Sequence, residues 1–144
     1  MTKLLILLHT ISACIWVGGH LILAITILPK SLKERNPKYI EDFESKYEKI
    51  GIPALLIQVI TGFMMFINYG LNYTDIFSFD SHFSRMLSYK IILLLLTILL
   101  AAHARIFIIP KLSESNLNSL AIHIIIVTIL SMFFVYFGVS VRFA

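Results

Sequence analysis

Four long apolar segments, almost free of charged residues, constrain this chain more than any other feature of its sequence. As a helix, the first would be about 37 Å long at roughly 1.5 Å per residue, which exceeds the ~30 Å hydrocarbon core of a bilayer. The segments are residues 4–28, 51–69, 89–109 and 117–141. They predict an all-α integral membrane protein whose single domain, residues 1–144, is an antiparallel four-helix bundle.

Composition and the placement of charge exclude several other classes of protein. Hydrophobic residues make up 58% of the chain and charged residues 14%, which is too apolar for a soluble domain. The net charge of +4 comes from basic residues beside the apolar segments, with no basic groove, so we expect no nucleic-acid partner. A single cysteine, Cys14, excludes a disulfide framework and a Cys-x-x-Cys metal motif.

The first apolar segment is expected to stay in the protein as a membrane span. It is too long for the apolar region of a signal peptide and lacks a small-residue cleavage pattern. Pro53 is expected in the first turn of the second span, and Pro110 is expected to end the third. Residues 37–50 place apolar side chains at helical spacing against charged ones, which predicts an amphipathic helix that lies on the membrane surface or extends the second span outward.

Basic residues are distributed unequally between the two ends of the predicted bundle. Eight lie on the face of the first-to-second and third-to-fourth connections: Lys30, Lys33, Arg35, Lys38, Lys46, Lys49, Arg105 and Lys111. Four lie on the opposite face: Lys3, Arg85, Lys90 and Arg142. The positive-inside rule then predicts a multi-pass protein of the inner cell membrane with both termini extracytoplasmic.

Ionisable residues inside the spans are costly in lipid, so they normally face the bundle interior and have a function there. His9, Ser12, Trp16 and His20 are spaced by three, four and four residues, which places them on one stripe of the first helix. We expect this stripe to face inward. His9 and His20 are about 16 Å apart along the helix axis at roughly 1.5 Å per residue, so they must serve two different layers.

Three histidines from three helices are predicted to share one depth. His20 and His103 each lie four residues beyond the middle of their spans, and His123 lies six residues before the middle of an antiparallel span. All three therefore fall about 6 to 9 Å from the midplane on the same side. The sequence predicts that they converge on one metal centre. The alternative is that each histidine only forms a hydrogen bond across a helix interface.

Imidazoles without a thiolate or thioether suit haem iron, Cu(II) or zinc. We favour haem b, with copper as the alternative, because small residues beside the histidines leave room for a flat macrocycle. These residues are Gly18, Gly19, Ala101, Ala102 and Ala104. The same residues would also permit close helix packing. Arg105, near the cytoplasmic edge, could pair with haem propionates or extend to the membrane surface.

A second layer is predicted at the depth of His9, toward the opposite side. The second span presents Gln58, Thr61, Gly62 and Met65 on one face, and Lys90 and Arg142 lie at the same end. The layer is either a second haem or metal site or ordinary interior packing with Lys90 as an interfacial anchor.

Several short motifs together resemble the CopD-like copper-resistance membrane proteins over nearly the whole chain. They are Leu8-His9-Thr10, Trp16-Val17-Gly18-Gly19-His20, Phe43-Glu44, Gly51-Ile52-Pro53-Ala54-Leu55, Thr61-Gly62, Lys90 and Ala102-His103-Ala104-Arg105 before Pro110. The chain is similar also to the related HemJ-type protoporphyrinogen oxidases, in which a first-helix histidine and a third-helix lysine are implicated with haem b. His9 and Lys90 stand at those positions. The stretch Ile27-Leu28-Pro29-Lys30 and the extra His20 depart from the HemJ pattern and favour the CopD-like branch.

Three functions follow from these patterns. The first is a haem- or copper-binding membrane protein for electron transfer or copper handling, in which His20, His103 and His123 supply ligands. The second is an oxidase of a porphyrinogen or quinol, whose haem at His9 or His20 passes electrons to an acceptor in the membrane. The third is an assembly partner without a cofactor. The expected partners are the lipid bilayer and a membrane redox partner, porphyrin or quinol, and a homo-oligomer stays open.

Overall fold

The computed structural model describes residues 2–141, and within them the protein is built of helices and connecting turns. Helix α1 (Thr2–Ile22) continues through a π-helical segment (Leu23–Ile27) into α2 (Leu28–Glu34), and α3 (Lys38–Asn68) follows. After a 3-10 turn (Tyr73–Asp75), α4 (His82–His103) continues through a second π-helical segment (Ala104–Ile108) and a 3-10 turn (Ile109–Lys111), and α5 (Leu117–Ser140) ends the described chain. Four helical stretches are long and apolar enough to span a membrane, so the predicted all-α four-helix architecture is confirmed.

Both π-helical segments end two residues before a proline, Pro29 in one case and Pro110 in the other. A proline ring collides with the carbonyl four residues earlier and removes one hydrogen bond, and a widened turn accommodates both defects. The third stretch ends at Lys111, next to Pro110, as predicted.

The second span begins earlier than expected. Helix α3 runs without a break from Lys38 to Asn68, so the amphipathic residues 37–50 extend the span outward, which was one of the two arrangements left open. The prediction that Pro53 stands in a first turn is therefore wrong, because Pro53 lies inside α3. Its missing N–H falls where the charged half of the helix meets the apolar half.

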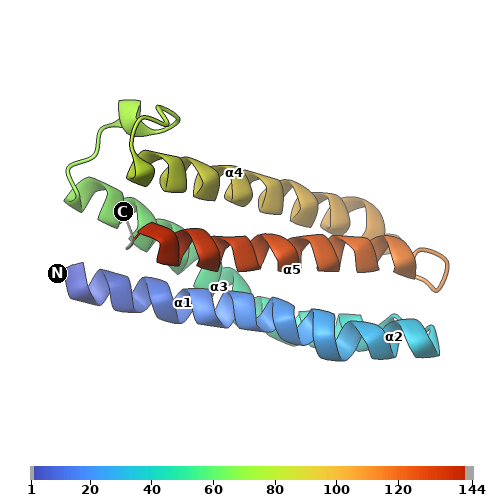
Figure 1. Cartoon of the computed structure of the whole chain (residues 1–144). Coiled ribbons are helices and arrows are strands. Elements are labelled where there is room, and N and C mark those ends of the chain that lie inside the picture. The colour runs from blue at the N-terminus through green and yellow to red at the C-terminus, as the bar shows by residue number, and fades with distance from the viewer. Residues whose placement is uncertain (1, 142–144) are drawn as a thin grey trace.

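The four spans are arranged as an arc rather than a closed ring. In Figure 1, α4, α5 and α1 lie in order from top to bottom, with α3 behind, and the start of α1 and the end of α5 lie at the same end of the bundle. The most extensive packing is between α1 and α3, and α5 packs against both α1 and α4. Within residues 2–141, α3 and α4 make no comparably extensive contact, so the arc is least closed on that side.

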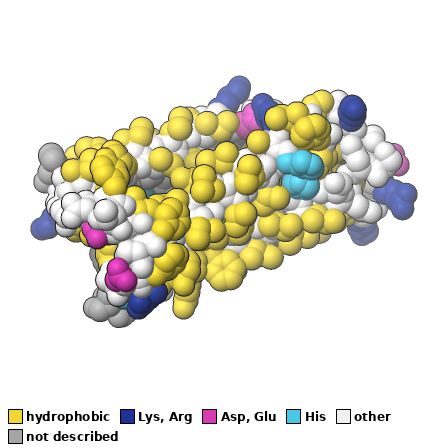
Figure 2. Space-filling model, turned by 90° about the horizontal axis from the view of Figure 1, so that it is seen from above, with side chains coloured by type: hydrophobic (Ala, Val, Ile, Leu, Met, Phe, Trp, Pro, Cys, Tyr) yellow, Lys and Arg dark blue, Asp and Glu magenta, His cyan; other side chains and the backbone are white. Residues whose placement is uncertain are grey.

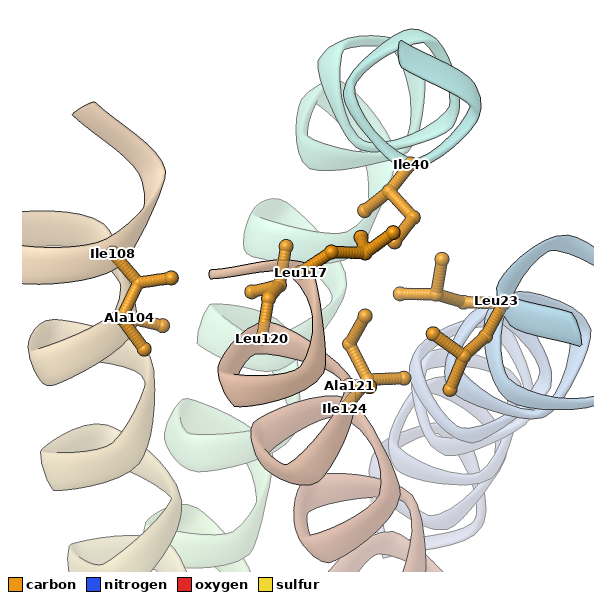
Figure 3. Close-up of a cluster of buried hydrophobic side chains, with 9 residues drawn as sticks. Leu23, Ile40, Ala104, Ile108, Leu117, Leu120, Ala121 and Ile124 are labelled. Atoms are coloured by element: carbon orange, nitrogen blue, oxygen red, sulfur yellow. The ribbon is translucent and has the colours of Figure 1, made fainter. Parts of the chain in front are cut away.

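A large apolar cluster fills the end of the bundle that carries the α2–α3 and α4–α5 connections. Figure 3 shows its side chains pointing toward one another from every span. The buried members are Leu23, Leu28, Ile40, Ala104, Ile108, Leu117, Leu120, Ala121 and Ile124. A smaller cluster around Trp16, Val17 and Val127 continues the core toward the middle. Toward the other end the buried groups of α4 are polar, with Ser84 and Ser88 enclosed.

Candidate functional site

His103 and His123 meet across the α4–α5 contact, in agreement with their predicted equal depth. Nδ1 of His103 lies 2.9 Å from Nε2 of His123, and the rings are nearly parallel with centroids 5.0 Å apart. Nδ1 of His123 lies 2.9 Å from the carbonyl oxygen of Ser119, one turn earlier on α5. The two imidazoles thus form a short hydrogen-bonded chain that ends on a backbone carbonyl.

These two hydrogen bonds determine which ring nitrogen carries the proton in the neutral form of each histidine. A carbonyl oxygen only accepts, so the proton of His123 must be on Nδ1, and its Nε2 then accepts the Nδ1 proton of His103. Nε2 of His103 is left with a free lone pair. Metal-binding histidines commonly have this arrangement, with one nitrogen held by a hydrogen bond and the other free for the metal.

The pair lies on the outer surface of the chain, not in the bundle interior. His103 is exposed and His123 is partly exposed. Figure 2 shows histidine side chains on a face that is otherwise covered mainly by apolar side chains. The expectation that intramembrane histidines face inward therefore holds for α1 and fails for this pair.

His20 does not join His103 and His123, so only two of the three histidines that were predicted to converge lie together. Its Nδ1 donates to the carbonyl oxygen of Trp16 (2.8 Å), and its ring packs on Trp16 and edge-on against Tyr47. Among residues 2–141, no group of three or more His, Cys, Asp or Glu side chains is placed to hold a metal ion. Equal depth did not ensure convergence, because His20 faces α3 while His103 faces away from it.

His9 lies in the predicted second layer and is held by α3. Its Nδ1 is 2.9 Å from Oγ1 of Thr61, and Thr61 donates its own proton to the carbonyl oxygen of Ile57 (2.6 Å). Thr61 must therefore accept from His9, which leaves Nε2 of His9 free. A Cβ on Gly62 would stand 3.4 Å from Cε1 of His9, so the glycine lets the imidazole lie close against α3.

Lys90 of α4 is the charged group that acts on His9. Its ammonium is within electrostatic reach of the His9 ring and lies beside Gly138 of α5, where a Cβ would stand 3.5 Å from Nζ. Four helices, α1, α3, α4 and α5, thus contribute to one layer, although Arg142, also predicted there, lies outside the described residues. The two α1 histidines have free Nε2 atoms in separate layers with Trp16 between them, as their spacing predicts.

Arg105 lies on the side of the bundle that faces α3, away from the His103–His123 pair. It forms an ion pair with Glu48 and lies close to the half-buried Glu44. Its charge is therefore already balanced by carboxylates. Glu44 and Glu48 were not predicted to face inward, although a spacing of three residues from Glu44 to Tyr47 and of one from Tyr47 to Glu48 puts all three on one face of α3.

Tyr47 of this inward group contacts α1 directly. Its hydroxyl donates to the carbonyl oxygen of Trp16 (2.7 Å), which also accepts from His20. Gly19 and Gly51 lie directly against the Tyr47 ring, and a Cβ on Gly19 would overlap it. Gly19, which was predicted to leave room for a macrocycle beside His20, thus admits a tyrosine of the same chain, whereas a Cβ on Gly18 would meet nothing within 4 Å.

The His103–His123 pair does not fit a bis-histidine haem. Two axial imidazoles bound at about 2 Å on either side of an iron would be ~4 Å apart with a flat ring between them. Here the facing nitrogens are in direct hydrogen-bond contact at 2.9 Å, and no ring can lie between them. A single metal ion fits better, because the free Nε2 of His103 can bind it without breaking any contact of the pair.

Two shallow apolar hollows of about 290 and 280 Å³ occur away from the pair, the first between α4 and α5 and the second on α5. The first is lined by Tyr89, Ile92, Leu93, Leu130, Phe133 and Phe137, and the second by Ile129, Met132, Phe133 and Tyr136. Neither includes a histidine.

A comparison with protein families matches residues 41–141 to the family described as copper resistance protein D. The matched region contains α3, α4 and α5 almost completely, with Lys90, His103, Arg105 and His123. No curated protein and no solved structure matches the chain.

Proposed function

Because the chain belongs to the copper resistance protein D family, we propose that it binds a copper ion within the membrane as part of copper handling. His103 is the ligand, through Nε2, and His123 orients it. The supporting observation is the chain of hydrogen bonds from His103 through His123 to the Ser119 carbonyl. It holds His103 in the one neutral form whose Nε2 is free for a metal.

The chemistry of the two imidazoles agrees with copper. Copper is one of the metals that imidazole nitrogens bind well, and hydrogen bonds to the second nitrogen raise the basicity of the ligand. Cys14 cannot supply a thiolate here, because it lies on α1 and this surface is formed by α4 and α5. Copper bound through His103 would be cargo or a regulatory ion held by one strong donor.

Copper content of the purified protein tests this proposal. The protein is loaded with copper in detergent, exchanged into metal-free buffer and analysed for metal. We expect His103→Ala to lose the bound copper, since it removes the donor nitrogen. His82→Ala is the matched control, because His82 is also on α4 but contacts the Ser140 carbonyl at the other end of the bundle. Equal copper in His103→Ala and the unchanged protein would refute the proposal.

A second candidate function is a haem b-dependent oxidoreductase at the His9 layer, acting on a porphyrinogen or a quinol. The observation in its favour is the Thr61 contact, which leaves Nε2 of His9 free as an axial donor with the Lys90 cation near it. A haem held by His9 would supply one-electron chemistry and pass electrons to an acceptor in the membrane. Lys90 would balance negative charge on a propionate or on the substrate.

An absorption spectrum separates the two candidate functions. A haem at His9 gives a reduced-minus-oxidised visible band that His9→Ala removes and His103→Ala leaves unchanged. A colourless protein that retains copper would exclude the haem function and keep the copper function.

We also propose that the α2–α3 and α4–α5 connections are cytoplasmic, in the inner membrane, because the excess of basic residues lies at that end. In a Cys14→Ser background, Ser115→Cys should be labelled by a membrane-impermeant thiol reagent only after the cells are opened. Thr74→Cys should be labelled in intact cells. The reverse pattern would invert the orientation.

A further inference from the structure

The His103–His123 pair presents a polar group to a part of the membrane where lipid offers no partner. His103 lies about 10 Å from the middle of the span His82–Lys111, and His123 about 8 Å from the middle of Leu117–Ser140, at roughly 1.5 Å per residue. The hydrocarbon region extends about 15 Å to each side of the midplane. Both imidazoles therefore lie within it.

The Nε2 lone pair of His103 has no hydrogen-bond donor among the described residues. The hydrogen bond of the ring is the one from Nδ1 to His123, and the side of the ring packs near Phe107, with centroids 5.3 Å apart. Hydrocarbon cannot hydrogen-bond, and ionisable side chains in spans almost always face protein or a water-filled cavity. Something other than lipid must therefore cover this surface.

A second copy of the chain fits this surface for a chemical reason. A two-fold axis beside His103 would bring the same surface of each copy together, and so the two free Nε2 atoms. Two lone pairs cannot bond to each other, but they can share one cation, and one imidazole from each copy gives the two donors that Cu(I) accepts.

We infer that two copies of this chain pack through the outer faces of α4 and α5 and share one copper ion between their His103 side chains. The inference rests on the proposed copper function and adds the partner that completes its site. A single His103 leaves the ion with one protein donor, whereas two copies supply a matched pair, each oriented by its own His123.

The test measures copper content and mass on the same sample. Protein loaded with Cu(I) under reducing conditions is analysed for metal and for mass by light scattering in detergent. We expect one copper ion per two chains and a dimer. His103→Ala should lower the copper content at least 10-fold and shift the protein to a monomer at the same concentration. His82→Ala should behave as the unchanged protein.

Cross-linking identifies the surface through which the copies meet. In a Cys14→Ser background, Phe107→Cys, one turn from His103 and 63% exposed, should join two chains through a short bismaleimide. The control Leu56→Cys is 57% exposed but lies on α3, and it should give no cross-linked dimer. Cross-linking at Leu56 and not at Phe107 would place the dimer contact elsewhere and refute the inference.

The outcomes distinguish this inference from the proposed function. One copper ion per monomer, lost in His103→Ala, would keep the copper function and refute the shared site. Absence of copper from all variants would refute both. A dimer that His103→Ala leaves intact, with copper still at one per two chains, would refute the role of His103.

Discussion

The inward histidines of α1 and the outward pair on α4 and α5 differ in what holds them. His9 and His20 donate from Nδ1 to a threonine of α3 and to their own helix, so packing within the chain determines their positions. His103 donates to another histidine on the outer surface of α4 and α5. In each region the free nitrogen is Nε2. The comparison shows that the same residue in the same protonation form serves an interior layer in one place and an outer surface in the other.

The largest effect is expected at the outer pair, where the two histidines have unequal roles. His103→Ala should abolish copper binding, since it removes the donor. His123→Ala should weaken binding about 10- to 100-fold, because it removes only the group that orients the donor. Titration with a competing chelator measures both. If the two variants lose copper equally, both rings bind the metal and the assigned protonation pattern is wrong.

In the inner region, a methyl group added at Gly19 should lower the free energy of unfolding. Gly19→Ala should destabilise the protein by about 1–3 kcal/mol, because the new methyl group overlaps Tyr47 and displaces its hydroxyl from the Trp16 carbonyl. Gly18→Ala is the control, since a Cβ there meets nothing within 4 Å. Trp16, the single tryptophan and a buried one, reports thermal unfolding in detergent by fluorescence. Equal melting temperatures would show that the Tyr47 contact is not tight.

The hydrogen bond that holds His9 should make a smaller contribution. Thr61→Val removes the acceptor and should cost about 0.6–1 kcal/mol, typical of interhelical hydrogen bonds in membranes. Thr61→Ser keeps the hydroxyl and should be close to the unchanged protein. Thermal unfolding measures the cost, and the ¹⁵N spectrum of His9 should show loss of the fixed Nδ1–H form in Thr61→Val alone. An unchanged spectrum would contradict the assignment.

The smallest effect is expected at the ion pair between α3 and the end of the third span. Glu48→Gln should change the unfolding free energy by less than about 0.5 kcal/mol, because Arg105 is 60% exposed and Glu44 remains close to it. Denaturant titration in mixed micelles measures the change. A loss above ~1 kcal/mol would mean that this ion pair closes the open side of the arc.

Several parts of the fold could be predicted because they depend on composition along the chain. Five of the eight predicted span ends lie within two residues of the observed ones, including the end near Pro110. The first span ends six residues later than predicted, at Glu34, and the third begins seven residues earlier, at His82. The start of α3 was not predicted, because hydropathy alone places the first residue of this span at Gly51. The charged residues 38–50 are in fact part of the same helix. Propensity and amphipathic spacing allowed this extension, but only contacts such as that of Tyr47 with Trp16 select it.

For the candidate site residues, the depth in the membrane could be predicted, but the side of the helix that faces the bundle could not. His103 and His123 meet as expected, whereas His20 lies elsewhere and Arg105 pairs with Glu48 instead of pointing at the histidines. Depth follows from counting residues along a helix, with a small error per residue. Direction changes by about 100° per residue and depends on how each helix is rotated against its neighbours.

By itself the sequence determined that this protein spans a membrane four times, that histidines lie at two depths within it, and which ends carry its basic charge. These properties follow from the hydropathy of each segment and from the number of residues along each helix. Both can be read from the sequence without knowing which helices touch. Only the tertiary structure decided that α3 and α4 stand apart, that His9 and His20 face inward, and that His103 and His123 face outward. Those choices depend on side-chain packing between distant segments, such as that of the Tyr47 ring of α3 directly against Gly19 of α1.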